Sequence, residues 1–175
     1  MSLQQPRDDA NVTLLIRVNR VFSISIKEMF PRHLACLKHE EAEDLSDRIA
    51  AAGKAISDQD LWQVCGMMVA TYDQNSVAGH DLSDQSNVGW LLLDRAEVDD
   101  PLDVVMLPGG RYAVLRHVGP YENLTIAYDY LYTEWLEESG ETLRNSPTFE
   151  MYLNTPEQVA PEELITLIYV PLESA

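Results

Sequence analysis

The strongest constraint on the fold is an internal repeat. The segments 29–31 and 34–39 resemble the segments 106–108 and 112–117, at an offset of 77 or 78 residues. Both copies read Met, apolar, Pro and then, after a short gap, apolar-Ala-apolar-Leu-base-His. A repeat of this length means that each half forms one supersecondary unit, and that the two units bury their faces together.

The repeat continues through a predicted helix in each half, marked by apolar residues at i, i+4, i+7 and i+11. These residues are Leu45, Ile49, Ala52 and Ile56 in the first half, and Leu124, Tyr128, Leu131 and Trp135 in the second. Asp44 and Asn123 precede the two stripes as N-cap candidates. Gly140 follows the second stripe, where a C-terminal glycine is favoured.

Runs with strand character surround each helix. They cover 21–26, 67–72 and 88–93 in the first half, and 103–106 continuing into 111–117, 148–153 and 164–170 in the second. Each half therefore reads as strand–helix–strand–strand, which is typical of an α+β fold with antiparallel sheets. We expect two tandem units, 20–93 and 103–172, around a shared central cleft. The acidic segment 94–100 links them within a single domain, 19–175, and 1–18 reads as a disordered lead or tag remnant.

The balance of charged residues argues against some classes of function. The chain carries 12 Lys and Arg against 29 Asp and Glu, a formal net charge of −17. This argues against direct nucleic-acid binding, which depends on basic contacts to phosphates, and against docking on an anionic membrane. No apolar run has the length of a membrane span, and the N-terminus lacks the apolar core of a signal peptide. We therefore expect a cytoplasmic protein with free thiols at Cys36 and Cys65.

No motif for a metal, a cofactor or a catalytic residue stands out. None of the four histidines has metal-ligand spacing to a cysteine. His39 and His117 are equivalent in the repeat, but no serine, cysteine or acid is placed beside either in the way a catalytic triad requires. We assign no catalytic residue, no metal and no cofactor, and the residues alone leave an enzymatic role open.

Aromatic residues supply the binding candidates, because seven of the eight tyrosines lie at or after Tyr112. Strand alternation within 148–153 puts Phe149 and Met151 on one face, and Glu150 and Tyr152 on the other. If the apolar face packs on the helices, Glu150 and Tyr152 face the cleft as a carboxylate–phenol site for a cation. The alternative is a solvated edge. Further candidates, for which core packing is the competing interpretation, are Tyr72, Trp90, Trp135 and Tyr169.

The second half also carries an ordered set of motifs. It comprises 107–113 (Leu-Pro-Gly-Gly-Arg-Tyr-Ala), 116–121, 135–136, 149–154 and 168–172 (Ile-Tyr-Val-Pro-Leu). The set resembles the GyrI-like effector-binding family, which includes the DNA gyrase inhibitory protein, the C-terminal domain of Rob and multidrug-binding regulators. The resemblance covers about residues 20–173 and implies two strand–helix–strand–strand units about a pseudo-two-fold axis.

The resemblance implies a cleft that binds small hydrophobic, aromatic or cationic molecules. In many members a glutamate in the last strand contacts the positive charge of the ligand. The matching residue here is Leu167, which would line the same cleft with an uncharged side chain. The stretch before the first strand is too short for a helix-turn-helix, so we expect a stand-alone ligand-binding domain. The resemblance also implies two alternatives: a gyrase-inhibitor-like module that binds a topoisomerase or a transcription component, and a hydrolase of toxic electrophiles.

Overall fold

The computed structural model describes residues 22–37, 45–72 and 85–174, so Asp44 and the proposed lead 1–18 lie outside the described residues. The first half contains β1 (Ser23–Met29), β2 (Arg32–Leu37), α1 (Leu45–Asp58), β3 (Cys65–Tyr72) and β4 (Gln85–Leu92). The second half contains β5 (Leu102–Leu107), β6 (Gly110–Val118), α2 (Leu124–Tyr130), α3 (Leu136–Ser139), β7 (Thr148–Tyr152) and β8 (Ile165–Pro171). The predicted α+β class is confirmed, and the predicted strands end within three residues of the observed ones. The strand β2 was not predicted, and the run 103–117 is divided into β5 and β6.

Within the described residues, eight strands form one antiparallel sheet, in the order β1-β6-β8-β7-β3-β4-β2-β5. Exchanging each strand for its equivalent in the other half gives the same order read from the opposite edge of the sheet, as two-fold-related units require. The two units therefore share one sheet, where the sequence predicted a sheet for each unit. The two halves join through the β3–β7 pair, and β1 and β5 each cross over to pair with a strand of the other half.

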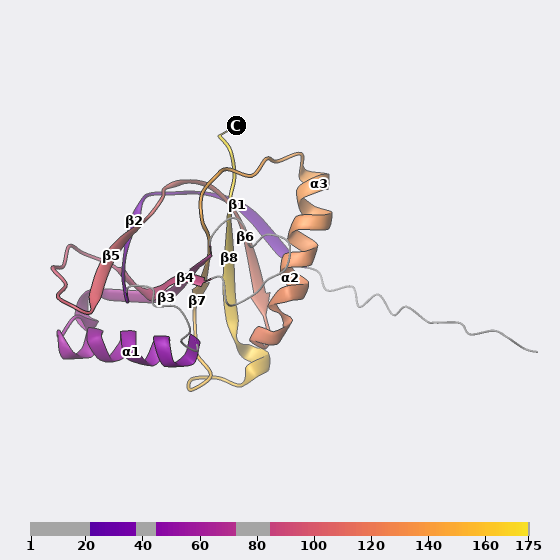
Figure 1. Ribbon diagram of the computed structural model, residues 1–175. Coiled ribbons are helices and arrows are strands. Elements are labelled where there is room, and N and C mark those ends of the chain that lie inside the picture. The colour runs from indigo at the N-terminus through magenta and orange to yellow at the C-terminus, as the bar shows by residue number, and fades with distance from the viewer. Residues whose placement is uncertain (1–21, 38–44, 73–84, 175) are drawn as a thin grey trace, which may run out of the picture.

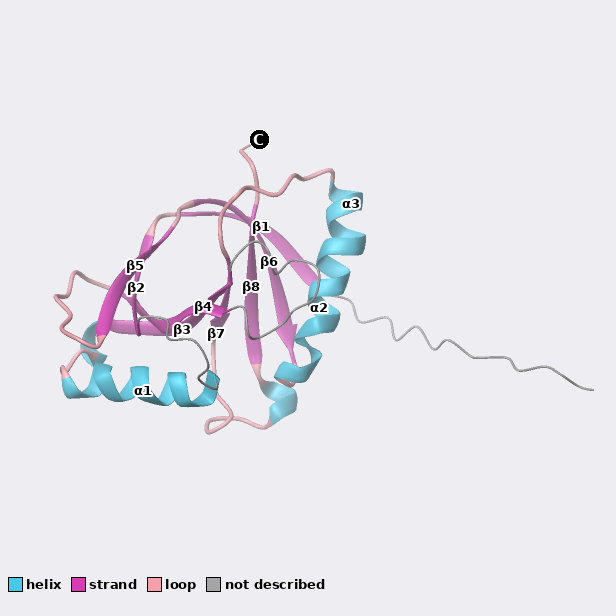
Figure 2. Ribbon diagram, in the orientation of Figure 1, coloured by secondary structure: helices cyan, strands magenta, loops and turns pink. Residues whose placement is uncertain are grey.

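The sheet curves strongly, and both helices lie outside the curve (Figures 1 and 2). Its inner face is filled by its own side chains. The rings of Phe149 and Tyr169 stack with centroids 4.5 Å apart, and Tyr112 meets both edge-on at 5.4 and 6.1 Å. The prediction that the face of Phe149 and Met151 packs on the helices is wrong, because strand curvature lets the two halves of this face bury one another.

The helices cover the outer face. Ala55 and Ile56 of α1 pack on Ala35 of β2 and Leu92 of β4. Residues of α2 and the turn after it pack on β6 and β8; they are Leu124, Ala127, Tyr128 and Leu131. The predicted apolar stripes face the core: Ile49 and Trp135 are partly buried, and the buried members are Ala52, Ile56, Leu124, Tyr128 and Leu131. The side chain of Leu45 lies outside the described residues.

The ends of the second helix differ in how well they match the prediction. Asn123 occupies the N-cap position, but its side chain makes no capping hydrogen bond, because a 3₁₀ turn (Tyr121–Asn123) leads into the helix instead. Gly140 ends the helix as predicted, with φ of +70°, a conformation that glycine adopts without strain. Between α2 and α3 the helix passes through a π-helical turn, Leu131–Trp135.

The backbones of β2 and β4 lie so close together at Gly89 that a larger residue at this position should destabilise the sheet. A Cβ added at Gly89 would overlap the carbonyl oxygen of Ala35 and lie 2.7 Å from the Cα of Cys36. We expect Gly89→Ala to lower the free energy of unfolding by about 1–3 kcal/mol, because backbone atoms must shift to relieve the overlap. Chemical denaturation measures this change.

Gly66→Ala is the matched control, because its Cβ would meet only side-chain atoms of the exposed Leu93 within 3.5 Å. It should change the free energy of unfolding by less than about 0.5 kcal/mol. Equal stability of the two variants would contradict the proposed constraint at Gly89.

Candidate functional site

Three tyrosine hydroxyls meet at the carboxylate of Glu150. Tyr152 donates to Oε2 over 2.5 Å and Tyr72 donates to the same oxygen over 3.0 Å. Tyr128 donates to Oε1 over 2.9 Å. Glu150 and Tyr152 come from β7, Tyr72 from β3 and Tyr128 from α2, so this carboxylate–phenol cluster connects both halves of the sheet to a helix.

The cluster lies on the outer face between the helices. Glu150 is fully buried, and Tyr72, Tyr128 and Tyr152 are each less than 9% exposed. Ile49 of α1 packs beside Tyr72 and Tyr152. The other helix, α2, contributes Tyr128, which donates to Glu150. A carboxylate can be buried when it is hydrogen-bonded, and hydrogen bonds to an ionised group are the stronger kind.

The repeat is broken at this point. Tyr72 and Tyr152 occupy equivalent positions in the two halves, and both donate to one oxygen of Glu150. The counterpart of Glu150 is Ala70, which lies directly opposite it in the β3–β7 pair. The two-fold arrangement therefore supplies a pair of phenols but one acid, and the small side chain of Ala70 leaves room for the carboxylate.

The phenols are held in their protonated, donating form. Burial raises the pKa of Tyr128 and of Tyr152 well above the usual value of 10, and the neighbouring Glu150 raises both further. Tyr121 meets the ring of Tyr152 edge-on with centroids 5.5 Å apart. Its pKa is also raised, first by burial and then by the charges of Glu157 and Glu150.

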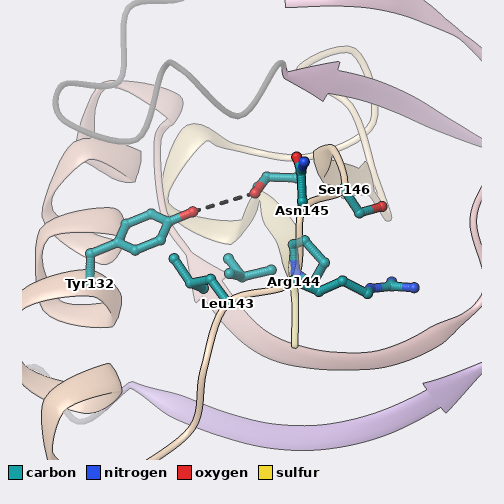
Figure 3. Close-up of a pocket in the computed structure, with 8 residues that line it drawn as sticks. Tyr132, Leu143, Arg144, Asn145 and Ser146 are labelled. Carbon is teal, nitrogen blue, oxygen red and sulfur yellow. Dashed lines mark hydrogen bonds between the residues drawn. The ribbon is translucent and has the colours of Figure 1, made fainter. Parts of the chain in front are cut away.

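A cavity of about 210 Å³ lies beside this cluster (Figure 3). Its lining residues are Tyr132, Leu143, Arg144, Asn145, Ser146, Thr148, Val170 and Pro171. The hydroxyl of Tyr132 lies 3.4 Å from Oγ1 of Thr148, and its ring stacks on Tyr128 with centroids 6.2 Å apart. Tyr132 thus separates the cavity from the residues around Glu150.

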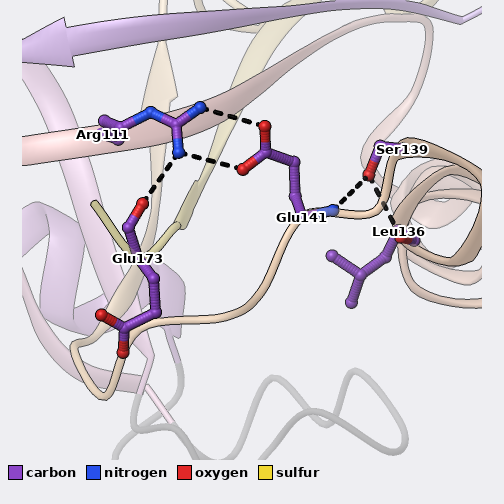
Figure 4. Close-up of polar contacts among 5 residues, drawn as sticks. All are labelled: Arg111, Leu136, Ser139, Glu141 and Glu173. Atoms are coloured by element: carbon purple, nitrogen blue, oxygen red, sulfur yellow. Dashed lines mark hydrogen bonds and ion pairs between the residues drawn. The ribbon is translucent and has the colours of Figure 1, made fainter. Parts of the chain in front are cut away.

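The segment 141–146, which forms one wall of the cavity, is fastened to the sheet. The guanidinium of Arg111 donates to both carboxylate oxygens of Glu141 at 3.0 Å and to the carbonyl of Glu173 at 2.8 Å (Figure 4). Arg144 donates to the carbonyl of Gly109 at 2.7 Å, and its guanidinium points away from Tyr132 (Figure 3). This wall is therefore attached to the sheet, and also to the end of α3 (Leu136–Ser139), where the amide of Glu141 donates to Oγ of Ser139 (Figure 4).

The predicted site residues divide into two groups. Glu150, Tyr152 and Tyr72 come together as described above. Trp90 lies under α1, edge-on to Trp62, and Trp135 packs at the margin of the core beneath α2. Neither tryptophan belongs to the carboxylate–phenol cluster.

Tyr169 and Leu167 lie on the other side of the sheet. Tyr169 belongs to the inner-face core, and Leu167 packs against the same core opposite Met151. The expectation that Leu167 lines the same site as Glu150 is wrong, because Glu150 is paired with Ile168 and successive residues of a strand point to opposite faces.

Tyr128 and Tyr132 were missed as site residues. Tyr128 was identified only as part of an apolar helix stripe, at the position equivalent to Ile49. A phenol on the buried face of a helix needs a hydrogen-bond partner, and this requirement was the available signal. Tyr132 follows one helical turn later and shares the same side of the helix.

Three further features of the described residues concern membrane spans, metal ligands and cysteines. Within them, no helix is long and apolar enough to cross a membrane, and no group of three or more His, Cys, Asp or Glu side chains could hold a metal ion. Both cysteines are free. Burial and the charge of Asp103 raise the pKa of Cys36 to about 11, against a smaller opposing effect of Arg48, so its thiol stays protonated at neutral pH.

Comparison with known families agrees with the fold. The model of the GyrI-like small molecule binding domain matches residues 22–173. The chain belongs to this GyrI-like family. Over 66 residues, the GyrI-like domain is 42% identical to the probable transcriptional regulator YgiV of Escherichia coli K12. That match covers 38% of this chain and 41% of YgiV, so it spans about two fifths of the relative.

Solved structures extend the likeness to almost the whole GyrI-like domain. The C-terminal domain of EcmrR has a TM-score of 0.65 at 18% identity, covering 89% of this chain and 99% of that one. SAV2435 bound to tetraphenylphosphonium has a TM-score of 0.52 at 14% identity, covering 87% of this chain and 94% of that one. At these identities the likeness establishes a shared fold.

The hydrogen bond from α2 to Glu150 can be tested by removing one hydroxyl. We expect Tyr128→Phe to lower the free energy of unfolding by about 1.5–3 kcal/mol, because Glu150 then stays buried with one donor fewer. Tyr130→Phe is the control on the same helix, since the ring of Tyr130 packs against Phe22 with centroids 5.2 Å apart. Similar losses in both variants, measured by urea denaturation, would refute a specific contribution from the Tyr128 hydroxyl.

The raised phenol pKa values predict a loss of stability in alkali. Above about pH 10 the unfolded chain releases tyrosine protons that Tyr128 and Tyr152 retain in the folded state, so the free energy of unfolding falls as pH rises. The contribution is complete below the unfolded pKa of about 10. Cys36 acts in the same direction from about pH 9. Denaturation between about pH 8 and 11 should show this decline, and Tyr128→Phe and Cys36→Ala should each make it shallower.

Proposed function

We propose that this GyrI-like domain binds lipophilic organic cations at the carboxylate–phenol cluster. The observation that supports this proposal is the buried carboxylate of Glu150 with the rings of Tyr72, Tyr128 and Tyr152 around it. Ring faces attract cations, and the carboxylate adds a full negative charge at the same point. SAV2435, which shares the fold, binds the lipophilic cation tetraphenylphosphonium.

The charge of the site favours a cation over other ligands. An anion would be opposed both by Glu150 and by the formal net charge of −17. A neutral aromatic molecule would gain contacts with the tyrosine rings but nothing from the carboxylate. The class that uses every part of the cluster is a cation whose charge is surrounded by apolar or aromatic groups.

Binding at this site requires side chains to move, because Glu150 has no exposed surface. A ligand that reaches the carboxylate has to displace at least one of the phenols that surround it. The apparent affinity is then the intrinsic affinity reduced by the fraction of molecules in the open arrangement. We therefore expect modest affinity and a broad range of accepted cations.

Tetraphenylphosphonium is a suitable probe for this proposal. We expect it to bind the wild-type domain in a calorimetric titration, and Glu150→Gln to weaken binding about 10- to 100-fold, which corresponds to about 1–3 kcal/mol of lost ion pairing and ring contact. Neutral triphenylphosphine oxide should be affected little, because it carries no net charge for Glu150 to attract.

Glu138→Gln controls for the overall charge, since Glu138 is exposed on α3 and the substitution changes the net charge equally. It should leave the affinity for tetraphenylphosphonium near the wild-type value. If both variants weaken binding equally, the attraction comes from the acidic surface. If Glu150→Gln binds as tightly as the wild type, Glu150 is not the cation site.

A further inference from the structure

We propose that the cavity beside Tyr132 is a subsite for an uncharged aryl group, and that Tyr132 is the gate between this subsite and Glu150. This inference rests on the proposed function, and it narrows the ligand class to cations that carry an aromatic arm. The evidence lies in the size of the cavity, in its lining and in the way Tyr128 and Tyr132 are attached to β7.

The size of the cavity suits one aromatic ring. An apolar protein cavity of about 150 Å³ is large enough to bind benzene, and this one measures about 210 Å³. Pockets for whole drug-sized molecules usually measure about 300–1,000 Å³. The cavity therefore accommodates one substituted ring of a larger ligand, and the rest of that ligand needs a second compartment.

The lining favours an uncharged group. Leu143, Val170 and Pro171 supply apolar surface, together with the ring of Tyr132. Arg144 also lines the cavity, but its guanidinium is directed to the carbonyl of Gly109 and lies over the ring of Tyr112, 5.2 Å from the centroid. A cationic centre would gain little here, whereas an aryl ring would contact the apolar part of the lining.

The second compartment is the carboxylate–phenol cluster, and the two are one step apart along β7. Thr148 and Glu150 point to the same face and lie about 7 Å from one another along the strand. Tyr132 and Tyr128, one helical turn apart, reach Thr148 and Glu150 respectively. The two stacked rings thus form the partition. When it opens, one aryl ring of a ligand can lie in the cavity while its cationic centre lies towards Glu150.

Tyr132 is the weaker part of this partition. Its hydroxyl lies 3.4 Å from the Thr148 hydroxyl, whereas Tyr128 is held by a charge-assisted bond of 2.9 Å. Tyr132 also lies in the π-helical turn Leu131–Trp135, a distortion that is frequent at functional sites in helices. The opposite wall is anchored through Arg111 and Glu141. Opening therefore starts at Tyr132.

The first experiment blocks the cavity. Leu143→Trp places a large ring in it, and Thr142→Trp puts the same ring on the exposed neighbouring residue as the control. We expect Leu143→Trp, but not Thr142→Trp, to weaken tetraphenylphosphonium about tenfold or more, with no change for tetraethylammonium, which lacks an aryl group. Asn145→Trp, at the exposed side of the lining, provides a second block if Leu143→Trp fails to fold.

A neutral probe tests the subsite without the cation. Toluene should shift the amide NMR signals of Thr148 and Tyr132 in the wild type and in Glu150→Gln, and these shifts should be lost in the blocked variants. Toluene binding that survives both blocks, or an unchanged affinity for tetraphenylphosphonium in them, overturns the subsite. If toluene binding depends on the cavity but Glu150→Gln does not affect cation affinity, the proposed cation site fails instead.

The gate has a kinetic readout. Tyr132→Phe and Thr148→Val each remove the weak hydroxyl contact, and we expect either change to raise the association rate of tetraphenylphosphonium about threefold or more. Tyr130→Phe, on the same helix, should leave the rate unchanged. Stopped-flow rates that are equal in all three variants and the wild type would show that Tyr132 does not control entry.

Discussion

The hydrogen bonds to one buried carboxylate connect the two halves of the sheet and the second helix. Glu150 has no exposed surface, so its charge must be compensated by donors inside the protein, and three phenols from β7, β3 and α2 supply them. The central strand pair and the second helix are therefore held in register by the same group that gives the site its chemistry. The ligand proposed for Glu150 has to compete with these hydrogen bonds, which also stabilise the fold.

The curvature of the sheet explains why the site lies where it does. A flat eight-stranded sheet would leave one face for a ligand or partner, whereas this sheet bends until its inner face is filled by side chains such as Phe149 and Tyr169. The carboxylate–phenol cluster lies on the outer face, between the two helices. On this face the repeat places the equivalent residues Tyr72 and Tyr152 close together on β3 and β7. The halves differ at one position, where Ala70 stands in place of a second Glu150, and this small residue leaves room for the carboxylate.

Much of the fold and part of the site could be predicted from the sequence. The repeat, the helix stripes and Gly140 depend on local spacing and backbone preference, which a sequence displays directly. Glu150 and Tyr152 were found because alternation along a strand is a local rule. Their orientation was assigned incorrectly, as was the position of Leu167, because alternation says which residues share a face and not which face the helices cover. Tyr128 was missed because its contact with Glu150 joins elements that are separate in the sequence.

The sequence by itself therefore determined the two-unit α+β organisation, the acidic character and the residue types available for recognition. Each of these follows from composition or from contacts within a few residues. Only the tertiary structure decided that the units share one sheet, that its inner face closes on itself, and that the two phenols of the repeat converge on a single carboxylate. Those outcomes depend on strand pairing between distant segments and on the curvature of the sheet. Both arise from small contributions of many residues, so no single residue in the sequence indicates them.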